Sequence, residues 1–234
     1  MIEVAALEDL GHFQNEWLNA HHHFSFGDYM NQNRMGLGPL RVWNDDTIAA
    51  QTGFPLHGHR DMEIITFVRE GAITHEDNLG NRGRTAAGNI QIMSAGTGIR
   101  HSEFNAEDKT TRLFQIWIEP NRKGHPPHWE TKLFPRSEDT SGLVLLASGR
   151  SQDAALDVPT IHQDAALFGA ALGTGQILDH GFKGNRKGYL VTSNGTVTVN
   201  GTEVGERAGA TIVGELEIKI TAIDDAEILL ADLP

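Results

Sequence analysis

The sequence predicts an all-β protein built from two similar β-rich units in tandem. The chain contains 26 glycines spread along its length, and short apolar runs lie between turn signals throughout. Only short segments are helix candidates. Many short strands between regular turn signals are typical of a sandwich or barrel, and not of a fold that alternates strands with helices.

The first half contains the clearest strand candidates. Met62–Val68 is almost wholly apolar, which fits a strand buried on both faces or a short buried helix. Ala72–His75 resumes the apolar pattern after a glycine break, and Asn89–Met93 and Leu113–Ile118 are further predicted strands. Residues 119–139 are rich in proline, charge and histidine, so we expect a linker or crossover there.

The second half repeats this β-rich character without a strict sequence repeat. Leu143–Leu146 is a short strand candidate, and Thr196–Val199 leads into Asn200-Gly201, the strongest short hairpin signal. Glu217–Ala222 and Glu227–Ala231 flank two aspartates and are predicted to pair as another hairpin. The few helix candidates are part of Leu7–Leu18 and Asp164–Leu172.

The bulk properties limit the classes of partner. The formal net charge of -12 and the pI near 5.4 argue against electrostatic binding to nucleic acid or to an anionic membrane. There are no cysteines, so disulfides and thiolate metal sites are excluded. The first thirty residues lack a basic start followed by an apolar run, and no segment reaches the ~18 apolar residues of a membrane helix. We therefore expect a cytoplasmic protein.

Two pairs of potential metal ligands are the most informative feature. His57 and His59 are spaced i, i+2, and so are His101 and Glu103, which begin 42 residues after His59. Alternate residues of a strand point to the same face, so each pair presents two donors side by side. If the two strands face one another across a barrel, three imidazoles and one carboxylate converge. Such a set suits a divalent transition metal and leaves open positions on a six-coordinate ion.

The surroundings of the second pair support this interpretation. A glycine-rich turn from Ser94 to Gly98 precedes His101, and glycines allow the backbone to turn sharply close to a ligand. Ten of the 12 histidines lie at or before His128. A metal site would therefore belong to the first half of the chain.

These segments resemble a known family. Gly53-Phe-Pro-Leu-His57-Gly-His59-Arg-Asp-Met-Glu63 resembles the first motif of the cupin superfamily, and Met93-Ser-Ala-Gly-Thr-Gly-Ile-Arg-His101-Ser-Glu103 resembles the second in the form found in pirins. The chain departs from the general pattern because three residues separate Gly53 from His57, Ser94 replaces a proline, and two extra residues precede His101. The pirin form shares the last two departures. Supporting matches are His23-Phe-Ser-Phe-Gly-Asp28-Tyr, Leu40-Arg-Val-Trp-Asn-Asp45-Asp and His75-Glu-Asp77.

The resemblance implies a bicupin, with a metal-carrying N-terminal cupin over residues 1–130 and a metal-free C-terminal cupin over residues 131–234. It implies metal ligands at His57, His59, His101 and Glu103. Iron(II) is the first candidate for the metal, and nickel, cobalt, manganese, copper and zinc are alternatives, because imidazole suits several of these ions. Some bacterial pirins act as quercetin 2,3-dioxygenases, so the resemblance implies a flavonol-like substrate and O₂. Glu103 would accept the proton of the substrate's 3-hydroxyl group.

Two alternative functions remain open. The first is a metal-binding regulatory module that contacts a protein partner without turnover, as described for eukaryotic pirins. The second is another metal-cupin activity, such as isomerisation of a sugar phosphate, for which the only cations near the predicted ligands are Arg60 and Arg100.

Other polar residues near the motifs receive simpler interpretations. Glu63 is either a strand residue bonded to its neighbours or a carboxylate that orients an imidazole. His75 is expected to make a structural hydrogen bond, and His125 and His128, beside two prolines, are expected to be solvated loop residues.

Overall fold

The structure is a computed structural model that describes residues 1–133 and 142–234. Its contacts divide the described chain into two compact units. The N-terminal unit contains residues 11–133 and 159–163, and the C-terminal unit contains residues 1–10, 142–158 and 164–234. The first ten residues thus belong with the second half of the chain. The boundary that the sequence places between residues 130 and 131 stays a prediction.

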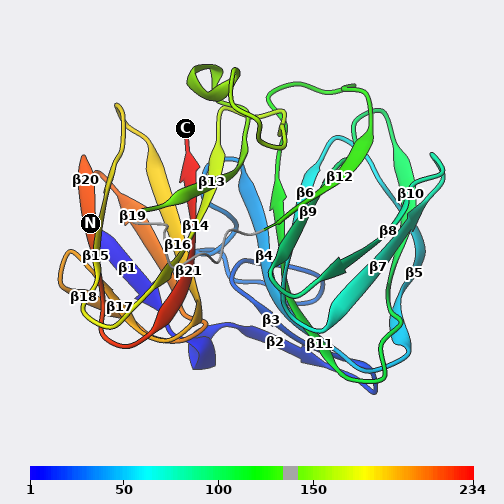
Figure 1. The fold of residues 1–234 in the computed structure, drawn as a ribbon, viewed down its shortest axis with the longest axis horizontal. Helices are drawn as coiled ribbons and strands as arrows, with labels where there is room; N and C mark the ends of the chain where they lie inside the picture. Colours follow the sequence, from blue (N-terminus) through cyan, green and yellow to red (C-terminus); the bar gives the residue numbers. More distant parts are fainter. Residues whose placement is uncertain (134–141) are drawn as a thin grey trace. The chain divides into compact units, whose positions relative to one another are not determined.

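The N-terminal unit consists of two antiparallel sheets (Figure 1). The seven-stranded sheet has the order β12-β9-β6-β11-β4-β3-β2, and the four-stranded sheet has the order β5-β10-β7-β8. The strands are β2 (Gly11–Gln14), β3 (Leu18–His22), β4 (Leu40–Ile48), β5 (Thr52–His59), β6 (Glu63–Glu70), β7 (Ala72–Asp77), β8 (Arg82–Ala86), β9 (Asn89–Ser94), β10 (Ile99–Asn105), β11 (Thr111–Ile118) and β12 (His128–Leu133).

The C-terminal unit also consists of two antiparallel sheets, with the orders β1-β19-β16-β21-β14-β13 and β15-β20-β17-β18. Its only helices among the described residues are two short 3₁₀ turns, η1 (Leu7–Asp9) and η2 (Ser151–Asp153). The strands are β1 (Ile2–Ala5), β13 (Val144–Ser148), β14 (Ala166–Leu172), β15 (Ile177–Gly181), β16 (Lys187–Asn194), β17 (Val197–Val199), β18 (Thr202–Val204), β19 (Gly209–Val213), β20 (Glu217–Ala222) and β21 (Ala226–Leu233).

The two units repeat one topology. Strands β4 to β11 form the orders β9-β6-β11-β4 and β5-β10-β7-β8, and strands β14 to β21 form the orders β19-β16-β21-β14 and β15-β20-β17-β18. Each strand of the first series therefore has a counterpart ten numbers later. The prediction of an all-β chain with two similar units in tandem is confirmed. In the described part of the chain, no helix is long and apolar enough to cross a membrane.

The helix prediction for Asp164–Leu172 was wrong. Asp164–Leu172 contains the strand β14, although its alanines favour a helix, because Phe168, Ala170 and Leu172 alternate into the apolar core of the C-terminal unit. Burial on both faces of that strand outweighs the local helix propensity. Within Leu7–Leu18 the chain forms only the turn η1 before it enters β2.

Two predicted connections can be compared with the structure. The segment 119–139 was expected to be a linker or crossover, and its described part also contains the strand β12, which pairs with β9 along its full length; residues 134–139 lie outside the described residues. The predicted hairpin of Glu217–Ala222 and Glu227–Ala231 was wrong, because β20 pairs with β15 and β17, whereas β21 pairs with β14 and β16. In a two-sheet unit, consecutive strands can enter opposite sheets.

Apolar clusters surround a polar region inside the N-terminal unit. Ile64, Thr66 and Val68 alternate along β6, and the two aliphatic residues belong to separate apolar clusters. The hydroxyl of Thr66 lies between them and donates to the Glu103 carboxylate at 3.3 Å. The two clusters therefore flank the region that contains the predicted ligands.

Candidate metal centre

The two ligand pairs lie on neighbouring strands of one sheet. His57 and His59 belong to β5, His101 and Glu103 belong to β10, and His57 is directly opposite His101 in the antiparallel register. The pairs were expected on strands facing one another across a barrel, and this was wrong. Direct pairing of β5 with β10 brings the histidines together more closely, because opposite residues of adjacent strands have their Cβ atoms about 4.5–5.5 Å apart.

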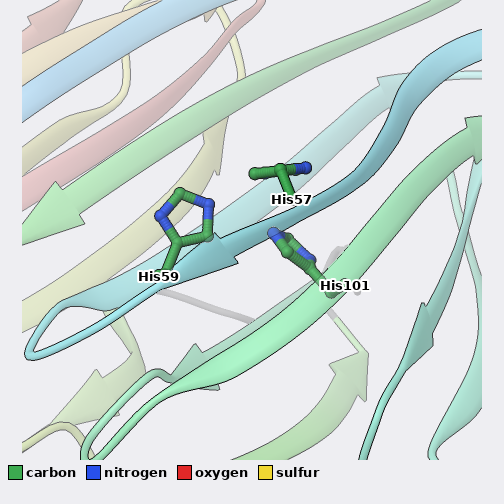
Figure 2. A group of neighbouring side chains, drawn as sticks. All are labelled: His57, His59 and His101. Carbon is green, nitrogen blue, oxygen red and sulfur yellow. The ribbon is translucent and has the colours of Figure 1, made fainter.

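The three histidines form one cluster (Figure 2). The ring centroids of His57 and His101 are 4.5 Å apart, those of His57 and His59 are 4.7 Å apart, and those of His59 and His101 are 5.1 Å apart. One ring nitrogen from each residue lies within 4.8 Å of the others. His101 is buried, whereas His57 and His59 are half-buried. One side of the cluster is therefore accessible from outside.

Hydrogen bonds and burial suit these imidazoles to metal binding. The His57 Nδ1 atom lies 2.8 Å from the Pro55 carbonyl oxygen, and donation to this oxygen leaves Nε2 as a ligand atom. The His101 Nε2 atom is buried and makes no hydrogen bond with any described residue. Burial, assisted by the charge of His57, lowers the pKa of His59 to about 4, and burial with the neighbouring histidines lowers the pKa of His101. Both rings are therefore neutral at pH 7, the protonation state that binds metals.

Glu103 lies beside this cluster but is held by other side chains. Gln91 Nε2 donates to Glu103 Oε1 at 2.6 Å, and Gln115 Nε2 donates to Glu103 Oε2 at 2.7 Å. The carboxylate falls in a second group of potential ligand atoms, with His75 and His101, and not in the three-histidine group. The structure thus brings three of the four predicted ligands together, and ligation by Glu103 stays a prediction.

A close backbone approach positions Glu103. The register between β5 and β10 shifts between His101 and Glu103, as in a β-bulge. A β-carbon on Gly53 would lie 2.3 Å from the Glu103 carbonyl oxygen. Glycine is therefore required at residue 53 for β5 to approach β10 at this point.

Burial also changes the acidity of Glu103. The side chain is 2% exposed, and burial raises its pKa to about 7, against the opposing effect of the hydrogen bonds from Gln115, Thr66 and Gln91. A carboxyl group with such a pKa can exchange a proton near neutral pH.

His75 connects the cluster to the carboxylate of Asp77 through contacts that the sequence did not indicate. Its Nδ1 atom lies 3.3 Å from the Nδ1 atom of His101, and its Nε2 atom lies 3.0 Å from Asp77 Oδ2. The ring stacks on Trp129 with a centroid distance of 4.9 Å. The expected structural hydrogen bond is present, and it belongs to a chain of contacts that ends at a predicted ligand.

Other histidines gather around Glu63. Ser94 Oγ donates to Glu63 Oε1 at 2.8 Å, and His162 Nδ1 lies 3.4 Å from the same oxygen. Glu63 is therefore bonded to neighbouring residues, and the imidazole it meets is not one of the predicted ligands. The expectation of a solvated loop was wrong for His125, which is 6% exposed and stacks on His162 at 3.8 Å. His128 is the half-buried first residue of β12.

In the C-terminal unit, the strands that correspond to β5 and β11 contribute an ion-paired cluster. His180 on β15 and Asp232 on β21 are 3.2 Å apart. Asp232 also accepts hydrogen bonds from Arg150 Nη1 at 3.0 Å and from Arg186 Nε at 2.5 Å. The polar groups of these strands therefore bond to one another, with no spacing of histidines like that of β5.

Comparison with known proteins places this arrangement in a family. Residues 4–118 match the family described as Pirin, and residues 145–233 match the family described as the quercetinase C-terminal cupin domain. A pirin-like protein of Caulobacter vibrioides is 53% identical over 232 residues, covering 99% of both chains. Quercetin 2,3-dioxygenase of Escherichia coli K12 is 41% identical, covering 100% of this chain and 99% of the relative.

A solved structure agrees with these relatives. The bacterial pirin YhhW of Escherichia coli, in complex with nickel(II), superposes with a TM-score of 0.93 at 40% identity, covering 100% of this chain and 99% of that chain. The family matches cover both β-rich units, and the structural similarity extends over the whole chain. The chain therefore belongs to the pirin family and has its two-domain cupin fold.

Proposed function

We propose that this chain is a metal-dependent dioxygenase that opens the central ring of flavonols such as quercetin. Both atoms of O₂ would enter the cleaved product, and one ring carbon would leave as carbon monoxide. The observation that carries the proposal is the convergence of three imidazoles, of which His59 and His101 are neutral at pH 7 and His57 and His59 are partly accessible. The similarity to a quercetin 2,3-dioxygenase over the whole chain supports the choice of substrate.

The proposed metal ligands are His57, His59, His101 and Glu103. We propose one divalent transition metal, with iron(II) as the first candidate and nickel, cobalt, manganese, copper and zinc as alternatives. A nickel-bound structural relative supports an ion of this class. When bound, the metal would supply positive charge to an oxygen anion of the substrate and would support its reaction with O₂.

The protein side chains would handle the substrate proton. The 3-hydroxyl group of the flavonol would give its proton to Glu103, whose carboxylate is buried beside the histidine cluster. Gln91 and Gln115 would hold the carboxyl group in place through their amide hydrogen bonds. Loss of the proton would leave a flavonolate, the electron-rich form of the substrate that reacts with O₂.

The test is turnover with defined metals. Protein purified without added metal would be loaded separately with each candidate ion and mixed with quercetin, first without and then with O₂. We expect loss of the near-visible quercetin absorbance and release of carbon monoxide only with O₂, and neither change in a His57→Ala variant. Quercetin binding without carbon monoxide release for every metal would contradict the proposal and favour the regulatory module.

A further inference from the structure

A second feature of the N-terminal unit is an aromatic cavity of about 490 Å³. It lies against β2, β3 and the segment that follows β3, and none of the proposed metal ligands lines it. Its volume falls within the range of about 300–1,000 Å³ that is usual for small-molecule sites. The main lining side chains are Phe13, Leu18, His22, Phe26, Asp28 and Tyr29.

The walls of this cavity are fixed by packing. A β-carbon on Gly11 would lie 2.3 Å from the Tyr29 ring, so that ring rests directly on the backbone of β2. The His22 ring lies 5.2 Å from the Phe26 ring and 6.4 Å from the Tyr29 ring. The cavity therefore has flat aromatic sides, which suit a planar ring.

Two residues of the cavity, His22 and Asp28, offer hydrogen-bond acceptors. The His22 Nδ1 atom lies 2.8 Å from Asn44 Oδ1, so this nitrogen carries the hydrogen and Nε2 is left with a lone pair. His22 is buried, and burial lowers its pKa, which keeps the ring neutral at pH 7. Asp28 adds an exposed carboxylate. Acceptors of this kind suit a ligand that brings donors, such as aromatic hydroxyl groups.

A chain of ring contacts joins the cavity to the histidine cluster. The Phe26 ring meets the Trp117 ring edge-on at 5.5 Å, and the Trp117 ring meets the His59 ring edge-on at 4.9 Å. One aromatic side chain, Trp117, therefore connects Phe26 of the cavity lining to a proposed metal ligand. A molecule with two linked ring systems could reach from one region to the other.

We propose that this cavity binds the hydroxylated phenyl ring of a flavonol while the fused ring system lies at the histidine cluster. The position of the fused rings rests on the proposed function, whereas recognition of the phenyl hydroxyl groups rests on the cavity alone. Asp28 and His22 accept the hydroxyl hydrogens, and Phe13, Phe26 and Tyr29 enclose the ring. The cavity is thus a specificity site for the hydroxylation pattern of the substrate.

The experiment compares two flavonols bound to metal-free protein without O₂, with tryptophan emission as the readout. One ligand is quercetin, and the other is a flavonol whose phenyl ring has no hydroxyl group. We expect quercetin to bind about tenfold more tightly, as a hydrogen bond to a charged acceptor would give. Asp28→Ala should reduce this preference to about threefold or less, and Gly11→Ala should weaken quercetin binding because it displaces Tyr29.

The control is Lys183→Ala, which alters the lining of a cavity of about 480 Å³ in the C-terminal unit; it should bind both ligands like the parent protein. Thermal unfolding checks each variant, and Tyr29→Leu replaces Gly11→Ala if the latter does not fold. The proposal would be overturned if Asp28→Ala, and Gly11→Ala or its replacement Tyr29→Leu, bound both flavonols with the affinities of the parent protein. Flavonol binding is measured without turnover, so a failed dioxygenase assay would not affect the binding result. Equally, a failed binding test would not affect the result of the dioxygenase assay.

Discussion

The Nδ1 atoms of His75 and His101 lie 3.3 Å apart, and this contact determines which nitrogen of His101 can bind a metal. Asp77 Oδ2 lies 3.0 Å from His75 Nε2, so His75 carries its hydrogen on Nε2 and accepts through Nδ1. The Nδ1 hydrogen of His101 must then lie in the contact between the two rings. The Nε2 lone pair of His101 is left available for the proposed metal, an arrangement like that of carboxylate–histidine–metal chains.

Replacing His75 should therefore weaken metal binding. The His75→Phe variant keeps a ring to stack on Trp129 but removes the acceptor for His101. We expect metal affinity to fall by about 10–100-fold, the usual effect of losing such a partner, as measured by competition with a chelator. A His180→Phe variant, altered in the other unit, should keep full affinity. Unchanged metal affinity in His75→Phe would show that His75 contributes packing but does not orient His101.

The two glycines of β5 should respond differently to alanine. In Gly53→Ala the new methyl group would meet the Glu103 carbonyl at 2.3 Å, whereas in Gly58→Ala the nearest atom would be Arg100 Cγ at 3.7 Å. Overpacking at residue 53 should lower the free energy of unfolding by about 1–3 kcal/mol, and the change at residue 58 should stay within about 0.5 kcal/mol. Urea denaturation of the two metal-free variants tests this contrast, and equal losses would contradict it.

Glu103→Gln should reduce turnover more than it reduces metal occupancy. The variant loses the group that accepts the substrate proton, and general-base catalysis contributes about 10²–10⁴-fold to a rate. The three histidines remain to hold the ion. Carbon monoxide release and metal content are measured on the same preparation, and Glu63→Gln, a buried carboxylate outside the cluster, serves as the control. Equal loss of both quantities would identify Glu103 as a purely structural ligand.

Asp46 should make the metal-free protein less stable as the pH rises. Burial, reinforced by the charges of Asp45 and Glu103 and opposed by Arg69, raises the pKa of Asp46 to about 8. The folded state keeps a proton that the unfolded chain loses above about pH 4. The contribution of protonated Asp46 to the free energy of unfolding is therefore complete below about pH 4. It declines as the pH rises, by up to about 1.4 kcal/mol per pH unit, until the pH passes about 8.

The Asp46→Asn variant tests whether Asp46 causes the predicted loss of stability with rising pH. Its free energy of unfolding should decline less between pH 5 and pH 8, since the amide does not titrate. Denaturant curves at several pH values give the two slopes. Glu103 also has a raised pKa, so a residual slope is expected in the variant. Identical slopes in both proteins would mean that Asp46 is ionised in the folded state.

The local signals in the sequence predicted much of the fold. The Asn200-Gly201 pair forms the turn between β17 and β18, and both residues have positive φ angles, 47° and 82°. The i, i+2 spacing correctly placed His57 and His59 on one face of a strand. These features depend on neighbouring residues only, so short sequence patterns are sufficient to recognise them.

The contacts that were missed depend on residues far apart in the chain. The pairing of His75 with His101 requires the register of β7 against β10, which no short pattern specifies. The stacking of His125 on His162 joins loops 37 positions apart. The strand at Ala166–Leu172 forms because the surrounding core accepts it, and local propensity pointed the other way.

The ion-paired cluster around Asp232 has a consequence for engineering and for evolution. A divalent cation placed beside His180 would meet the guanidinium groups of Arg150 and Arg186, which both already pair with Asp232. Grafting a second histidine into β15 would therefore leave a repulsive environment for an incoming ion. Building a metal site in the C-terminal unit like the one proposed for the N-terminal unit would require Arg150 and Arg186 to be replaced together with Asp232.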